Sequence, residues 1–151
     1  MADDTDVLLT FCGQCWEEIR HIEKQRATLT NLVILVASAV IGLIVQQGFA
    51  RSFIALTILL ILLGAYGIAT TLKFYERYQF LENRLDYWYR RIDKLHPKAE
   101  YSLLRSNADE DHKTRTRYPR MLRIHVHWLW LILHSAISFS GILLLVIILI
   151  K

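Results

Sequence analysis

Three long stretches without a charged side chain constrain this chain more than any other feature. They run over about residues 30–45, 53–72 and 128–150, and His134 is the only side chain in them that titrates near neutral pH. A helix needs roughly 20 apolar residues to cross the hydrocarbon core of a bilayer, whereas a core-facing helix of a soluble bundle mixes charged with apolar residues. The sequence therefore predicts an all-α integral membrane protein with three transmembrane helices.

The basic residues predict how these helices are oriented. Residues 73–127 hold 13 of the 18 Lys and Arg, while the turn between the first two stretches holds only Arg51 and the C-terminal end only Lys151. Basic residues collect on the cytoplasmic side of a membrane, and tryptophans such as Trp128 and Trp130 collect at its interface. We therefore expect the N-terminus and residues 73–127 in the cytoplasm and the C-terminus outside.

The charged and apolar stretches together divide the chain into four segments. The residue before a proline avoids the helical region, so the helix that contains the second stretch should end before Pro97. After Pro97 we expect a short helix, then a polar loop over 106–118, and a last helix that begins at Pro119. The four segments are an amphipathic N-terminal helix (1–28), a two-helix transmembrane hairpin (29–72), a long cytoplasmic helix with a basic loop (73–127) and the third transmembrane helix (128–151).

A heptad pattern follows the second apolar stretch. Over residues 74–95 apolar side chains recur at alternating steps of four and three, and charged residues fill the other positions. This spacing is typical of a helix that presents a seam to another helix in a coiled coil. We expect a coiled-coil-like stalk whose partner helix is either the N-terminal arm of the same chain or a neighbouring subunit. The seam residues chosen for oligomerisation are Tyr78, Leu81, Leu85, Trp88 and Ile92.

Polar and small residues interrupt the third apolar stretch. His134, Ser135, Ser138 and Gly141 form a narrow stripe on a helix that is otherwise Leu and Ile. An ionisable residue inside a membrane is costly and is a functional hypothesis by default. Two interpretations stay open: the stripe lines a pore, or a neutral His134 bonds to a hydroxyl of a neighbouring helix.

Small residues also recur in the other two stretches. Ser38 and Gly42 lie in the first stretch, and Gly64 and Gly67 lie in the second. Such spacing allows the backbones of membrane helices to approach closely. It predicts tight helix packing without identifying the partner.

A basic cluster precedes the third stretch. Such juxtamembrane clusters contact anionic lipid headgroups, and membrane lipid is therefore an expected partner. The alternative is a site for a phosphate-bearing signal such as a nucleotide or an oligonucleotide. The cluster consists of Lys113, Arg115, Arg117, Arg120 and Arg123.

No residue pattern indicates an enzyme. Cys12 and Cys15 form a CxxC, but the strand–helix context of a redox pair is missing, and a zinc site would need further ligands. We interpret them as small packed residues on a reduced cytoplasmic helix. The sequence also lacks a Gly-rich phosphate loop and a paired-carboxylate motif, so we expect no catalytic residue, no metal and no cofactor.

The layout resembles the SLATT family of small bacterial membrane effectors. The residues that carry the resemblance are Trp16–Arg26, the transmembrane hairpin after them and Tyr75–Leu95. The third apolar stretch is a departure, because the simplest family members have two. The resemblance implies a homo-oligomeric pore in the bacterial inner membrane that depolarises or permeabilises an infected cell in antiphage defence, controlled by a cytoplasmic signal or a signal-producing partner protein. The alternative is a non-channel anchor or scaffold subunit that docks a partner through its cytoplasmic helices.

Overall fold

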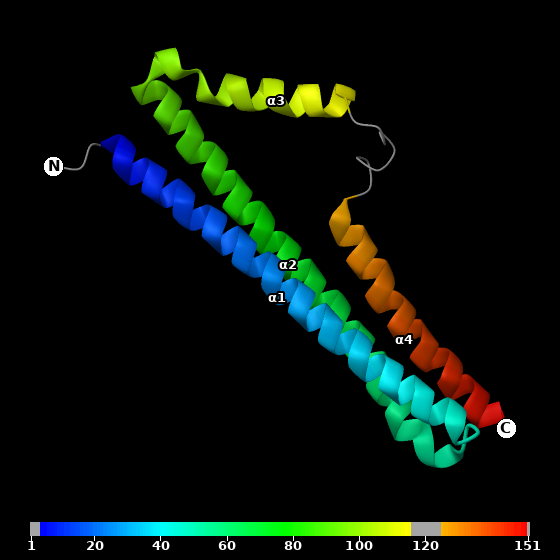
Figure 1. Cartoon of the computed structure of the whole chain (residues 1–151). Coiled ribbons are helices and arrows are strands. Elements are labelled where there is room, and N and C mark those ends of the chain that lie inside the picture. The colour runs from blue at the N-terminus through cyan, green and yellow to red at the C-terminus, as the bar shows by residue number, and fades with distance from the viewer. Residues whose placement is uncertain (1–3, 116–124, 151) are drawn as a thin grey trace. The chain divides into compact units, whose positions relative to one another are not determined.

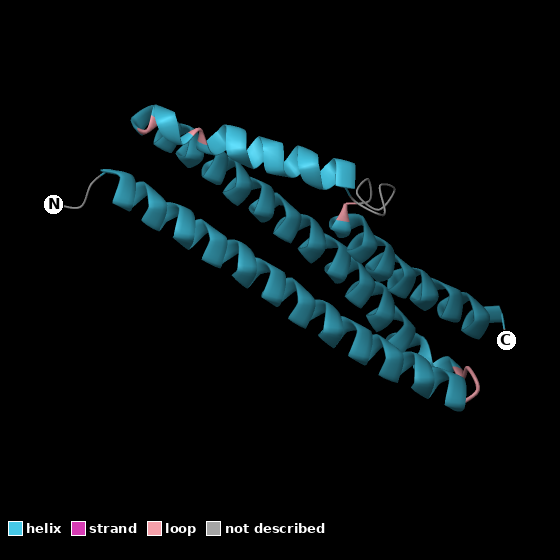
Figure 2. Cartoon of the chain, turned by 45° about the horizontal axis from the view of Figure 1, so that its top comes forward, coloured by secondary structure: helices cyan, strands magenta, loops and turns pink. Residues whose placement is uncertain are grey.

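Every regular element in the described part of the chain is a helix. The computed structural model describes residues 4–115 and 125–150, and within these ranges Figure 2 shows helices and short loops. Three helical segments are long and apolar enough to cross a membrane, namely α1, the segment Arg51–Leu95 and α4. The elements are α1 (Asp4–Gln46), a 3₁₀ turn (Arg51–Phe53), α2 (Ile54–Leu95), a second 3₁₀ turn (Pro97–Ala99), α3 (Tyr101–Arg115) and α4 (Val126–Ile150).

The first two helices are much longer than a membrane crossing requires. α1 has 43 residues and α2 has 42, so at 1.5 Å per residue each is roughly 60 Å long, about twice the hydrocarbon thickness of a bilayer. Each helix therefore has one apolar and one charged half without a break between them. This confirms the prediction that the heptad segment continues the second apolar stretch in one helix, and it shows that the N-terminal arm likewise runs straight into the first.

The turn between α1 and α2 is short and depends on backbone conformation. Gly48 and Phe49 both have positive φ, 76° and 62°. Glycine adopts this region without cost, and it often ends a helix in this way. Phe49 accepts the strain while its ring packs against the apolar core, and its N–H donates to the carbonyl of Ile44 at 3.3 Å.

The other end of α2 lies where the sequence predicts it. The last helical residue is Leu95, the N–H of His96 donates to the carbonyl of Ile92 at 2.8 Å, and Pro97 begins a 3₁₀ turn. A proline suits the first position of a helical turn because it has no N–H to satisfy there.

The chain divides into two compact units, each of which contains parts of α1 and α2. Unit 1 comprises Met1–Glu23 and Glu76–His125, and unit 2 comprises Lys24–Tyr75 and Val126–Lys151. Figure 1 labels the helices along the chain.

Unit 1 is an antiparallel helix pair with α3 added. The hydroxyl oxygen of Thr5 lies 2.7 Å from Nε2 of His96, whereas Glu18, further along α1, lies 3.9 Å from Arg77, which is earlier on α2. The core between the two helices is small, so few side chains hold the pair together. Its buried residues are Cys12, Cys15, Ile19 and Ile22 of α1 and Leu81, Leu85, Tyr89 and Ile92 of α2.

The polar loop predicted over 106–118 is wrong for residues 106–115. These residues continue α3, which ends at Arg115. The Asp93 carboxylate accepts hydrogen bonds from the first two N–H groups of the helix, those of Tyr101 (2.8 Å) and Ser102 (3.1 Å), and this capping from a distant residue stabilises a helix start that the local sequence lacks. The predicted helix start at Pro119 lies outside the described residues.

Unit 2 is a three-helix arrangement of α1, α2 and α4. Thr30 of α1 lies beside His134 of α4, 104 positions further along the chain, and Arg26 lies over Trp130 at the same separation. α1 and α4 are therefore parallel, and α2 runs antiparallel to both. The shared apolar core contains Val33, Ala37, Ile44, Leu60, Ile137, Leu144 and Ile148.

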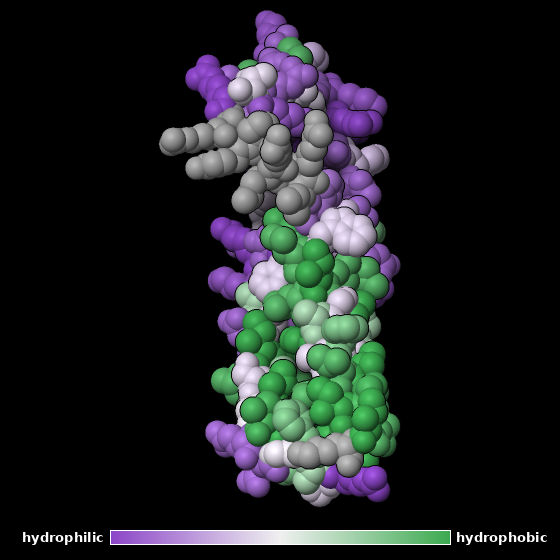
Figure 3. Space-filling view, turned by 90° about the vertical axis from the view of Figure 1, so that its right-hand side faces the viewer, coloured by the Kyte–Doolittle hydropathy of each residue, from purple (hydrophilic) through white to green (hydrophobic). Residues whose placement is uncertain are grey.

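The outside of unit 2 is as apolar as its inside. Leu35, Leu62 and Ile132 are each more than 60% exposed, and the face that carries α4 is hydrophobic along its length in Figure 3. A soluble domain rarely exposes so large a contiguous apolar surface. The surface is the kind that a bilayer covers.

Candidate functional sites

His134 is completely buried inside unit 2. Its Nε2 lies 3.4 Å from the hydroxyl oxygen of Thr30. The ring packs on the backbone of α2 at Gly67, where any added Cβ would overlap the ring. The Nδ1 atom has no hydrogen-bond partner within the described part of the chain, and an unsatisfied buried nitrogen costs about 1–3 kcal/mol.

Two more members of the polar stripe pack against α2. The hydroxyl of Ser138 donates to the carbonyl of Ile61 at 3.3 Å, and a Cβ at Gly64 would lie only 2.5 Å from the Ser138 nitrogen. Gly141 lies against Ile61 in the same way. Small residues on both helices thus allow the two backbones to approach closely.

The stripe is therefore a packing surface within one chain. His134, Ser138 and Gly141 face α1 and α2, and the geometry at His134 matches the interpretation of a histidine beside a hydroxyl, with Thr30 supplying that hydroxyl. Only Ser135 is exposed. The pore-lining role of His134, Ser135, Ser138 and Gly141 stays a prediction.

A second polar face lies on α1; from the sequence, Ser38 and Gly42 were predicted only as small residues for close packing, and Asn31 was not predicted at all. Asn31 and Ser38 are exposed, and no atom lies within 4 Å of an ideal Cβ on Gly42. The Ser38 hydroxyl donates to the carbonyl of Ile34 at 2.7 Å, and the Asn31 side chain is exposed. The sequence signal for this face is the seven-residue spacing of Asn31 and Ser38, which places both on the side of the helix opposite the buried Val33.

Cationic and aromatic side chains meet where α4 begins. The Arg26 guanidinium carbon lies 5.5 Å from the centroid of the Trp130 ring. Tyr75 and His127 stack with centroids 4.0 Å apart. Amphipathic rings beside cations are typical of the boundary between lipid and water.

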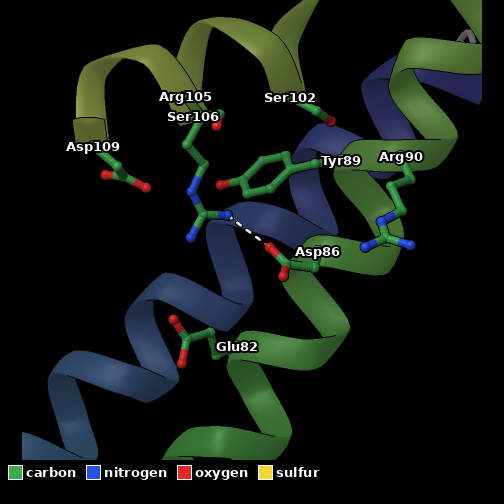
Figure 4. Close-up of a pocket in the computed structure, with 8 residues that line it drawn as sticks. All are labelled: Glu82, Asp86, Tyr89, Arg90, Ser102, Arg105, Ser106 and Asp109. Atoms are coloured by element: carbon green, nitrogen blue, oxygen red, sulfur yellow. Dashed lines mark hydrogen bonds and ion pairs between the residues drawn. The ribbon is translucent and has the colours of Figure 1, made fainter. Parts of the chain in front are cut away.

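Unit 1 has a polar pocket of about 440 Å³ between α2 and α3 (Figure 4). The Arg105 side chain reaches from α3 to Asp86 on α2, with 2.9 Å between Nη1 and the carboxylate, and its guanidinium carbon lies 5.3 Å from the centroid of the Tyr89 ring. Arg105 thereby ties α3 to α2. The lining residues are Glu82, Asp86, Tyr89, Arg90, Ser102, Arg105, Ser106 and Asp109.

The charges of this pocket do not suit a polyphosphate. It has three carboxylates, and of its two guanidinium groups the one on Arg105 is already paired with Asp86. A nucleotide phosphate placed there would meet like charge, which disfavours binding. The pocket therefore gives no support to a nucleotide signal.

The basic cluster is only partly described. Lys113 and Arg115 lie on the exposed last turn of α3, and Arg115 Nε is 2.6 Å from the Asp111 carboxylate one helical turn earlier. Arg117, Arg120 and Arg123 lie outside the described residues. The contact of this cluster with lipid headgroups or with a phosphate-bearing signal stays a prediction.

The two cysteines have the environment of packed structural residues. Both are buried in unit 1, and burial raises the pKa of each thiol, with the neighbouring Cys15 raising the pKa of Cys12 further. A raised pKa keeps a thiol protonated and poorly reactive. Among residues 4–115 and 125–150, no group of three or more metal-ligating side chains could hold an ion.

The predicted seam has a partner within its own chain. Leu81, Leu85 and Ile92 are buried in unit 1, while Tyr78 and Trp88 are half-buried. The heptad pattern did not include Tyr89, which is buried. The reason is that a straight helix drifts from a strict seven-residue repeat. The seam therefore packs on the N-terminal arm, and the coiled-coil stalk and oligomerisation through these residues stay predictions.

A scan against protein-family models, a search of curated proteins and a search of solved structures each found no match for this chain.

Proposed function

We propose that this protein is a homo-oligomeric membrane pore whose opening depolarises or permeabilises the membrane that holds it. In this proposal unit 2 crosses a bacterial inner membrane three times, with the N-terminus in the cytoplasm and the C-terminus outside. We further propose, from the resemblance to SLATT effectors, that it acts in antiphage defence under control of a cytoplasmic signal or partner protein that acts on unit 1.

The outer face of α1 is the observation that carries the proposal. Asn31 and Ser38 are exposed on a helix whose exposed neighbours Leu32 and Leu35 are apolar, and the space beside Gly42 is open. A polar amide that faces lipid is costly. Contact with another copy, or with water in a pore between copies, would remove that cost.

A bulky residue at Gly42 tests the proposal without disturbing the single chain. Because no atom lies within 4 Å of its ideal Cβ, Gly42→Leu fits the protomer, but it would prevent close approach of a second chain. Gly13→Leu is the matched control, since Gly13 also lies on α1 with open space beside it.

The measurement is the membrane potential of bacteria that express each form, followed with a voltage-sensitive dye. We expect the unmodified protein and Gly13→Leu to depolarise the cells and Gly42→Leu to lose most of this effect at equal protein level. Equal depolarisation by both variants would contradict a role for the outer face of α1. A steady potential with the unmodified protein, also during phage infection, would contradict the pore.

A second function, a membrane anchor that docks a partner protein, is favoured by a different observation. His134, Ser138 and Gly141 pack against helices of their own chain. The third crossing therefore needs no neighbouring subunit to bury these residues. Pull-down with intact protein distinguishes the two: an anchor retains a cytoplasmic partner through unit 1 and leaves the membrane potential steady.

A further inference from the structure

A groove of about 680 Å³ runs along unit 2 between α2 and α4. It is lined by Ile68 of α2 and by residues of α4 from Trp128 to Ile142, and none of its lining residues is on α1. The lining is mostly apolar, but the exposed Ser135 contributes a hydroxyl partway along it. Ser138 also lines the groove, although its hydroxyl already donates to the carbonyl of Ile61.

The polar residue on the outer face of α1 lies at the same depth as this hydroxyl. The pair Thr30 and His134 shows that an α1 residue is level with the α4 residue 104 positions further on, since the two helices are parallel. By this register Asn31 is level with Ser135. Copies of one protein insert in one orientation, so the Asn31 of every copy lies at the depth of the Ser135 of every other copy.

We propose that the groove between α2 and α4 receives the outer face of α1 from a second copy of this chain, with the Asn31 amide hydrogen-bonded to the Ser135 hydroxyl. This inference rests on the proposed homo-oligomer and specifies its interface. A lipid acyl chain could fill the apolar groove, but it would leave both polar groups unsatisfied. A second copy satisfies both, and the open space at Gly42 lets its helix approach closely.

The proposed interface is head-to-tail, because the face on one copy differs from the groove on the next. Each copy then has one free face and one free groove until the assembly closes. Such heterologous contacts produce rings when the rotation between copies closes. A ring of this kind would surround a central space, as the proposed pore requires.

Cysteine crosslinking tests the register of the interface. The double variant Asn31→Cys with Ser135→Cys is oxidised in native membranes, and the products are separated by size without reductant. The matched control is Asn31→Cys with Ile142→Cys, which moves the second cysteine seven residues, or about 10 Å, along α4. The two single variants Asn31→Cys and Ser135→Cys control for the native cysteines, which are buried in unit 1.

We expect covalent dimers and larger ladders from the matched pair, several-fold more abundant than from the pair with Ile142→Cys. Equal crosslinking by both pairs, or none by the matched pair, would overturn the interface. The same cells report the membrane potential: depolarisation without the matched crosslink refutes this interface and leaves the pore standing. The matched crosslink with a potential that stays steady in the unmodified protein, also during phage infection, supports the interface and refutes the pore.

Discussion

The contact between Gly64 and Ser138 gives a strong prediction from a single methyl group. In Gly64→Ala the new Cβ would lie 2.5 Å from the Ser138 nitrogen and 2.7 Å from its Cα. Ordinary contact begins at 3.4 Å, so the shortfall is roughly 1 Å, and backbone atoms cannot rotate away as a long side chain can. The two helices must separate or shift, and overpacking of this size costs about 1–3 kcal/mol.

Thermal unfolding of the purified protein in mild detergent measures this cost, with Gly42→Ala as the control. Alanine favours a helix over glycine by up to about 1 kcal/mol, and at Gly42 nothing opposes that gain. We therefore expect a lower midpoint for Gly64→Ala and an equal or higher midpoint for Gly42→Ala. Equal midpoints for the two variants would refute the close packing of α2 on α4.

Three further predictions concern other contacts. Ser102, whose N–H donates to the carboxylate, and the N–H of Tyr101 hold the pKa of Asp93 below its usual value, so its capping of α3 is complete above the ordinary pKa of about 3.9 and is lost as pH falls through the lowered value. Hydrogen exchange, corrected for intrinsic rates, should show weaker protection of α3 in Asp93→Asn at pH 7 and in the unmodified protein in acid; unchanged protection would contradict the cap. Leu85→Asp buries a charge inside unit 1, so proteolysis of that unit should accelerate while unit 2 stays protected; an unchanged digestion pattern would mean that the seam does not pack on the N-terminal arm. His134→Ala should lower the free energy of unfolding by about 1–3 kcal/mol, a lost contact partly offset by removal of an unsatisfied nitrogen; an unchanged free energy of unfolding with altered ion flux would instead favour a pore lining.

Local patterns were sufficient to predict the long helices. Charge-free stretches located the apolar half of each helix, and Pro97 located the end of α2 at Leu95. The polar residues after position 105 were wrongly predicted to form a loop. The start of their helix depends on Asp93, which lies eight positions before Tyr101. A composition of Ser, Asn and Asp is typical of loops when no such cap is known.

The partners of each polar residue could not be predicted from one sequence. Polar and small residues among Leu and Ile identified the stripe at His134, but the hydroxyl beside it belongs to a residue 104 positions away. The same limit applied to Gly64 and Gly67, whose spacing predicted close packing without showing that α4 is the partner. Asn31 could be recognised as exposed only after the structure showed which face of α1 is buried.

The proposed function depends most on unit 2 crossing the membrane with residues 73–127 on the cytoplasmic side. Labelling of single added cysteines with a membrane-impermeant maleimide tests it, at the exposed Gln47 in the turn after α1 and at the exposed Lys94 near the end of α2. We predict that Gln47→Cys is labelled in bacteria whose outer membrane alone is permeabilised, and that Lys94→Cys is labelled only after the cells are lysed. Labelling of Lys94→Cys in those unlysed cells, or protection of both sites until lysis, would contradict the account.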